Sequence, residues 1–256
     1  MVKEKVSAER WEIAQHSEKE YWNEFDIDRL NKEESIRHKN KAALLEKEFE
    51  KFYKIDINTK ILQIGCGPED IINYFSKGKK YAVDPLASFY KNKFKINYKN
   101  VMFLEGRGEK LPFKDDFFDI VILANVLDHV EFPEKVLFEI SRVMKEKGIF
   151  HFENFFYQKS FIVLAKIFSF FKKISTGKIF NIHHPFMFTL PFLKRLISKN
   201  FQIIEDSICR ELGDYENVKE LKKQKLKNKK LSIKLPALFG LYGTINYMAI
   251  CRKRKL

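Results

Sequence analysis

The chain has 256 residues, 45% of them hydrophobic, and carries a formal net charge of +14. This length suits one large α/β domain or two small ones, with enough apolar residues for a sizeable core. The three cysteines, Cys66, Cys209 and Cys251, show neither metal-ligand spacing nor a disulfide framework. No apolar run approaches the roughly 20 residues of a membrane-spanning helix, and the first residues lack the apolar core of a signal peptide. We therefore expect a cytoplasmic protein without a transmembrane segment.

Lysine supplies most of the positive charge, 39 of the 48 basic residues. Such an excess is more typical of a solvated surface than of a nucleic-acid site, although it permits RNA, a phosphorylated substrate or a membrane surface as a partner. The densest run, at 218–234, has no interleaved aromatic residues for stacking on bases. RNA therefore stays possible as a partner but is not favoured.

The first 57 residues predict a helical extension. From residue 7 to about 53, charged residues are interleaved with apolar ones such as Trp11, Tyr21 and Trp22, and no glycine or proline occurs before Gly65. Such a pattern is typical of helices that pack one face on another part of the protein.

From residue 58 to 153, apolar strands alternate with helical segments. Strands are predicted at 60–65, 79–85, 101–106, 117–125 and 148–155, with helices at 69–78 and 132–148. This alternation implies right-handed crossovers and a doubly wound, Rossmann-like α/β sheet that is mostly parallel. Residues 190–256 add a helix at 190–200, a strand at 201–210 and a last strand from 243, which gives seven strands.

An insertion follows the fifth strand at 154–189, and it is rich in phenylalanine. Its apolar residues lie at 161, 162, 164, 165, 168 and 171, beside Lys166, Lys172 and Lys173. One interpretation is a lid helix that packs on the N-terminal helices, with Trp11, Tyr21 and Trp22 closing over an acceptor. The other is an interfacial amphipathic helix that contacts a membrane or a lipid-linked substrate. We prefer the lid, and leave a peripheral membrane contact open.

The first strand ends abruptly on two glycines, in "KILQIGCGPED". Gly65 and Gly67 would let the backbone turn tightly and approach a ligand at the carboxyl end of the strand. Asp84 ends the second strand, 19 residues after Gly65, which suits a carboxylate that binds both hydroxyls of a ribose. A dinucleotide site needs a third glycine, but Glu69 and Asp70 follow here and would repel a pyrophosphate. A cationic nucleoside such as S-adenosylmethionine is therefore preferred over NAD.

Two further stretches carry a family resemblance: "EGRGEKLPFKDDFFDIVILANVLDHV" at 105–130 and "FPEKVLFEISRVMKEKGIFHFE" at 132–153. With the glycine loop, they resemble class I S-adenosylmethionine-dependent methyltransferases of the small-molecule type, over roughly residues 58–153. The resemblance implies a methyltransferase with S-adenosylmethionine as cofactor. Its acceptor would be a small molecule, a sugar or a lipid-linked precursor, methylated on oxygen, nitrogen or carbon.

The resemblance also implies a role for each of ten positions. Residues 64–67 would lie under the methionine part, Asp84 would bind the ribose, and Pro85 would flank the adenine. Gly108 and Glu109 would lie at the adenine edge, and Asn125 and Val126 near the methyl group. The implied cofactor-binding set is Ile64, Gly65, Cys66, Gly67, Asp84, Pro85, Gly108, Glu109, Asn125 and Val126.

Three positions depart from the family pattern. Gln63 stands where an acidic residue is usual, Glu69 replaces the third glycine, and Arg107 replaces an aspartate that contacts the adenine amino group. An arginine cannot accept a hydrogen bond from that group. These departures leave open a non-catalytic module with a degenerate cofactor site, and the net charge leaves open an RNA methyltransferase.

The candidate catalytic residues are Asp128 and His129, after the fourth strand, and His184 on the insertion. A histidine there could deprotonate a hydroxyl or amine acceptor, because its pKa lies near the working pH. The alternative is that His129 packs a loop and Asp128 caps the next helix. No metal site is expected, because His183 and His184 are adjacent and no third ligand has suitable spacing. Glu153, at the end of the fifth strand, would also point at the ligand edge or else cap the insertion.

Overall fold

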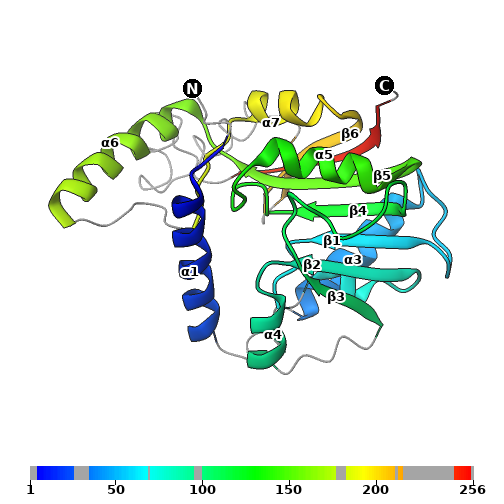
Figure 1. The fold of residues 1–256 in the computed structure, drawn as a ribbon. Helices are drawn as coiled ribbons and strands as arrows, with labels where there is room; N and C mark the ends of the chain where they lie inside the picture. Colours follow the sequence, from blue (N-terminus) through cyan, green and yellow to red (C-terminus); the bar gives the residue numbers. More distant parts are fainter. Residues whose placement is uncertain are drawn as a thin grey trace.

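A computed structural model describes residues 5–25, 35–68, 70–94, 100–176, 183–210, 213–215 and 245–254. At its centre is an eight-stranded sheet with the order β3-β2-β1-β4-β5-β8-β6-β7 (Figure 1). The strands are β1 (Lys60–Ile64), β2 (Lys79–Asp84), β3 (Val101–Glu105), β4 (Phe118–Ala124), β5 (Met144–Phe156), β6 (Phe201–Arg210), β7 (Gly213–Tyr215) and β8 (Ile245–Lys253).

The winding of the sheet reverses at β1, which pairs in parallel with β2 on one side and β4 on the other. β3 continues the parallel half on one edge and β5 on the other, while β8 runs antiparallel to both β5 and β6. In open sheets of this kind, ligands bind outside the carboxyl ends of the strands that flank the switch point. The loops after β1 and β4 therefore lie where a site is expected.

Helices cover both faces of the sheet (Figure 1). The described helices are α1 (Ala8–Glu24), α3 (Ser35–Phe49), η2 (Ile71–Tyr74, a 3-10 helix), α4 (Ala87–Phe94), α5 (Pro133–Val143), α6 (Lys159–Thr176) and α7 (Leu190–Ile197). α5 and α7 bury their apolar residues in one core, and α3, η2 and α4 in the other. No described helix is both long enough and apolar enough to cross a membrane.

The central strand β4 shows why two layers of helices are needed. Val121 and Leu123 belong to the core beneath α5 and α7, while Ile120 and Ile122 belong to the core beneath α3. Successive side chains of a strand point to opposite faces, so an uninterrupted apolar strand must be covered on both. α5 supplies one cover with a fully buried stripe that includes Val136 and Ile140, spaced one helical turn apart.

The predicted doubly wound, mostly parallel sheet is confirmed, with its N-terminal helices and the insertion after the fifth strand. The short β7 adds an eighth strand to the seven predicted. The helix predicted at 132–148 ends at Val143, and β5 begins four residues before the expected position. The cause is the pairing of Met144 with Phe118, across a register shift, at the start of β4. The lysine-rich run at 218–234 lies outside the described residues.

Candidate active site

The loop after β1 requires its glycines. Gly65 and Gly67 have φ angles of 66° and 59°, in the left-handed region that side chains rarely adopt. A Cβ atom on Gly65 would also lie 2.3 Å from Cγ2 of Val126, in the loop after β4. The two loops at the switch point therefore approach each other more closely than any other residue would allow.

Asp84, at the end of β2, holds this loop in place. Its Oδ2 accepts a hydrogen bond from the Gly67 amide at 3.0 Å, and its Oδ1 accepts one from the Leu86 amide at 2.9 Å. The side chain is buried, and burial raises the pKa of Asp84 to about 6, although both amide hydrogen bonds favour the charged form. This places a carboxylate on the wall of the site with its orientation fixed from two sides.

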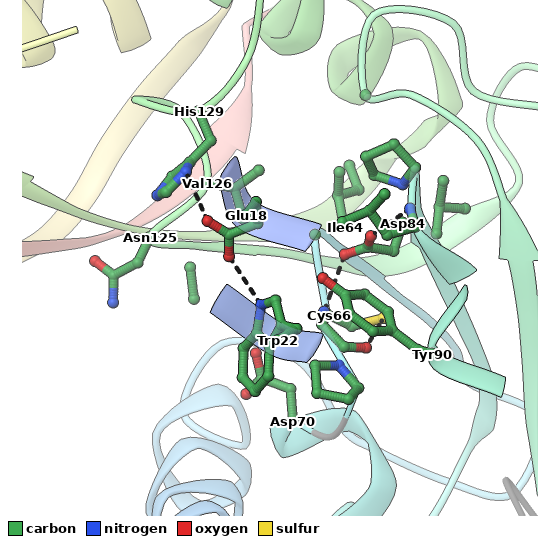
Figure 2. Close-up of a pocket in the computed structure, with 18 of the residues that line it drawn as sticks. Glu18, Trp22, Ile64, Cys66, Asp70, Asp84, Tyr90, Asn125, Val126 and His129 are labelled. Carbon is green, nitrogen blue, oxygen red and sulfur yellow. Dashed lines mark hydrogen bonds and ion pairs between the residues drawn. The ribbon is translucent and has the colours of Figure 1, made fainter. Parts of the chain in front are cut away.

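A cavity of about 350 Å³ lies over these loops. All ten residues of the predicted cofactor-binding set line it, together with Pro68, Asp70 and Leu86. Figure 2 shows Asp84 and Tyr90 on one side of this cavity, and Asn125 and His129 on the other. The volume falls in the range typical of small-molecule sites, which is about 300 to 1,000 Å³.

Helix α1 closes the cavity with one face. Trp11, Gln15, Glu18 and Trp22, spaced by three or four residues, all line it. The Nε1 of Trp22 donates to Glu18 at 2.9 Å, and the Trp22 ring packs edge-on against Tyr90 and Phe94 of α4 (Figure 2). Trp11, Tyr21 and Trp22 therefore border the same cavity as the glycine loop, and their closing over an acceptor stays a prediction.

Helix α3 supplies cations that were not predicted as site residues. Arg37, His38 and Lys41 line the cavity, and Lys41 Nζ lies 2.7 Å from Oε2 of Glu153 at the end of β5. Burial alone would raise the pKa of Glu153, but the His151 ring, 3.6 Å away, and the charge of Lys41 outweigh it and hold that pKa well below its usual range. Glu153 therefore carries a buried negative charge that fixes Lys41 at the cavity wall.

The residues that depart from the family pattern have structural partners. Gln63 is fully buried, and its Oε1 accepts from the Ile72 amide at 3.0 Å, which ties β1 to η2. Arg107 lies flat over Trp11, 3.9 Å from the ring centroid, and its Nη2 donates to Glu131 at 2.6 Å. Glu69 lies outside the described residues. Gln63 and Arg107 thus hold the scaffold of the site.

Glu109 also stabilises the start of helix α5. Its Oε1 accepts from the Glu131 amide at 2.9 Å and more weakly from the Phe132 amide at 3.3 Å, just before α5. Glu109 is buried and lines the cavity, so one oxygen anchors the start of α5 while the residue borders the cofactor position. A role for Glu109 at the adenine edge stays a prediction.

The three predicted catalytic residues lie together. Oδ2 of Asp128 is 2.7 Å from Nδ1 of His184, and the His129 and His184 rings have centroids 4.4 Å apart. One possible metal-ligand atom from each of the three residues lies within 4.8 Å of the other two, so this group could hold a metal ion. Spacing along the chain could not bring Asp128 and His184 together, because 56 residues separate them. The absence of a metal site stays a prediction.

Of these three, His129 lines the cavity, and Asp128 lies behind it with only 2% of its side chain exposed. Burial opposes ionisation of Asp128, but the charges of His129 and His184 and the His184 hydrogen bond outweigh it and lower the pKa of Asp128. Burial likewise opposes the charged form of His184, yet its bond to Asp128 raises the pKa of His184. His183 and His129 share a neighbour, since Oε2 of Glu18 lies 3.7 Å from Nδ1 of His183 and 3.9 Å from Nδ1 of His129.

Comparison with known proteins agrees with this geometry. A family model described as a methyltransferase domain matches residues 62–152. The uncharacterised methyltransferase YcgJ of Bacillus subtilis is 32% identical over 100 residues, 36% of this chain and 38% of its own length. The ubiquinone/menaquinone biosynthesis C-methyltransferase UbiE of Stutzerimonas stutzeri is 34% identical over 99 residues, 35% of this chain and 39% of its own. The match therefore spans less than two fifths of either relative.

Solved structures extend the likeness of fold to nearly the whole chain. A possible histamine N-methyltransferase of Thermotoga maritima superposes with a TM-score of 0.53 at 17% identity, over 94% of this chain and 98% of that one. At this identity the likeness is one of fold, and the family assignment rests on the matched domain. Residues 62–152 of this chain are thus identified as a methyltransferase domain of the class I S-adenosylmethionine-dependent type.

Proposed function

We propose that this protein transfers a methyl group from S-adenosylmethionine to a hydroxyl or amine of a small or lipid-linked acceptor. The observation that carries the proposal is the single cavity that has Gly65, Gly67 and Asp84 at one end and His129 at the other. The glycines and Asp84 suit the nucleoside of the cofactor, and His129 suits the acceptor.

The residues present fit this cofactor. The Gly65 backbone leaves no room for a side chain, and Asp84 offers a carboxylate to the two ribose hydroxyls. Glu18, Asp70 and Asp84 all line the cavity and disfavour a pyrophosphate, whereas a sulfonium and an ammonium group would be attracted. Arg37 and Lys41 on the α3 side are placed for a carboxylate. The departures from the family pattern therefore do not remove the site.

When bound, S-adenosylmethionine supplies an electrophilic methyl carbon on a sulfonium sulfur, which becomes a thioether as the methyl leaves. His129 takes up the acceptor's proton as the acceptor oxygen or nitrogen attacks that carbon. The imidazolium that forms lies beside the Asp128–His184 pair, whose buried carboxylate stabilises the positive charge. α1 excludes water from the reacting atoms with Trp11 and Trp22.

Isothermal titration with S-adenosylhomocysteine tests the cofactor half of this proposal. We expect micromolar binding that Asp84→Ala weakens by roughly 100-fold, because two charge-assisted hydrogen bonds to the ribose are lost. Glu205→Ala is the matched control, since Glu205 is a half-exposed carboxylate on β6 whose nearest partner is Lys51 at 3.9 Å. Absence of binding by the unaltered protein would leave the non-catalytic module as the correct alternative.

A second assay addresses the acceptor. Radiolabelled methyl transfer is measured with pools of hydroxylated, amine-bearing and lipid-linked small molecules, and with total RNA as the rival substrate. Label in RNA, combined with RNA binding that weakens steeply with salt, would replace our proposal by an RNA methyltransferase. The same assay after dialysis against EDTA is expected to show unchanged activity, because His129 takes up the proton and the Asp128–His184 pair stabilises the resulting charge without a metal ion.

A further inference from the structure

Helix α6 places its most apolar face on the outside of the molecule. It extends away from the sheet, at the upper left of Figure 1. Seven of its apolar side chains are between 47% and 69% exposed. Apart from Phe168, they are Val163, Leu164, Ile167, Phe170, Phe171 and Ile174. We call these six residues the outer face. Single exposed apolar residues are ordinary on a protein surface, but a continuous set of this size marks an interaction site.

The spacing makes the outer face one continuous stripe. Val163, Ile167, Phe170 and Ile174 follow one another by three or four residues, so they lie on one side of the helix. Ile162 and Ala165, on the opposite side, are 9% and 6% exposed and hold the helix to the protein. α6 is therefore apolar on both sides, and only the inner side has its partner within the described residues.

Positive charge accompanies this stripe. Lys159 and Lys166 are seven residues apart, so they lie on the same edge of the helix, between its two apolar sides, and both are exposed. The sequence adds Lys172 and Lys173 within α6, and eight lysines against a single glutamate at 218–234. An apolar stripe that is bordered by lysines suits the boundary between anionic headgroups and acyl chains, where lysine side chains reach the phosphates. A basic cluster on the same chain strengthens such binding.

We propose that α6 docks the protein on an anionic lipid bilayer, lying in the interface with its outer face among the acyl chains. The apolar stripe provides the affinity and the lysines provide the preference for negatively charged lipid. Docking does not depend on the methyl-transfer proposal, because it uses none of the residues that line the cavity.

The root of α6 also connects this surface to the site. The Tyr157 amide, two residues before the helix, donates to the Phe188 carbonyl at 2.8 Å, and the Phe186 amide donates to the Asp128 carbonyl at 3.4 Å. Tyr157 also stacks on Phe161 in the first turn, with ring centroids 5.3 Å apart. These contacts connect the root of α6, through residues 186–188, to the loop that carries Asp128.

Co-sedimentation with vesicles tests the docking. The full chain is mixed with phosphatidylcholine vesicles, or with vesicles that contain about one third phosphatidylglycerol, a fraction that gives a strongly negative surface. We expect binding at least tenfold stronger to the anionic vesicles. The double variant Ile167→Glu, Phe171→Glu should lose at least tenfold of that binding, because it places two charges in the acyl region.

Phe138→Glu is the matched control, since Phe138 is an equally exposed phenylalanine on α5, at 59%. It should bind vesicles like the unaltered protein, and thermal unfolding should show all three proteins folded. Titration with S-adenosylhomocysteine should also be unchanged in the α6 variant, which separates loss of docking from loss of the cofactor site. Equal binding of the α6 variant and the control would overturn the proposal. So would a dimer in light scattering that dissociates in the α6 variant without vesicle binding, which would assign the outer face to a second copy of the chain.

Discussion

Helices α1 and α6 both lie outside the layers that cover the sheet, and they use their apolar residues in opposite ways. α1 turns Trp11 and Trp22 onto the cavity, where Trp22 packs on Tyr90 and Phe94 of α4. α6 exposes Ile167, Phe171 and Ile174 and contributes none of its described residues to the cavity lining. A helical period in the sequence thus locates a contact face, while the fold alone identifies what the face can contact.

The largest effect should come from the acceptor end of the cavity that α1 closes. His129→Asn should lower kcat by about 100-fold or more, because an amide cannot accept the acceptor's proton. The cofactor affinity should change much less, since Asp84 and the glycine loop are untouched. Single-turnover rates with an acceptor from the assay above, beside titration with S-adenosylhomocysteine, measure the two effects separately.

The control for this variant is His16→Asn, because His16 lies on α1 with 75% of its side chain exposed and pairs with Glu20. It should retain full activity. If His129→Asn weakened cofactor binding as much as it slowed turnover, His129 would position the cofactor and the base would have to be sought elsewhere. A rate that still rises with pH in His129→Asn would point to His184.

A paired substitution compares the two helices directly. Trp22→Ala should destabilise the protein by about 2 to 3 kcal/mol, because it removes four aromatic contacts and leaves the Glu18 carboxylate without its indole donor. Phe170→Ala on α6 should change stability by less than about 0.5 kcal/mol, since that ring is 63% exposed. Urea unfolding of both variants measures the difference, and equal values would mean that α6 is covered as α1 is.

Sequence reasoning found the parts of the site that are local in the chain. The glycine loop, Asp84 and the loop after β4 each follow a strand, and parallel strands bring their carboxyl ends to one edge. Ordered motifs therefore located ten residues that line one cavity. The early start of β5 escaped prediction because it depends on pairing with β4. The 3-10 geometry of η2 also escaped it, and there the Ile72 amide bonds to the Gln63 side chain of β1.

The missed residues come from helices that reach the site from outside the matched domain. Glu18, Arg37 and Lys41 line the cavity, yet no motif in the sequence around them indicates a ligand. One signal was present, since Arg37 and Lys41 are four residues apart and so share a face of α3. That spacing indicates a basic stripe, but only the ion pair between Lys41 and Glu153, 112 residues away, fixes the stripe at the cavity.

A change of pH should distinguish cofactor binding at the cavity from vesicle binding at α6. Burial raises the pKa of Asp84 to about 6, so the carboxylate takes up a proton as the pH falls through that value. The ribose hydroxyls need the ionised form as acceptor, so S-adenosylhomocysteine should bind about tenfold more weakly at pH 5 than at pH 7. Asp84→Asn should bind weakly at both values. Vesicle binding through the α6 lysines should change little over this range, because lysine stays charged.

The smallest effect on stability should come from the outer face, and it is measured by comparing the outer and inner sides of α6. Ile174→Ser removes a side chain that is 69% exposed, whereas Ile162→Ser removes one that is 9% exposed on the inner side. The first should leave the free energy of unfolding within about 0.5 kcal/mol, and the second should lower it by about 2 kcal/mol. Vesicle binding should show the reverse order, with the larger loss in Ile174→Ser. If Ile174→Ser instead destabilised the protein in the absence of lipid, the outer face would already have a partner within the chain, and the contrast with α1 would disappear.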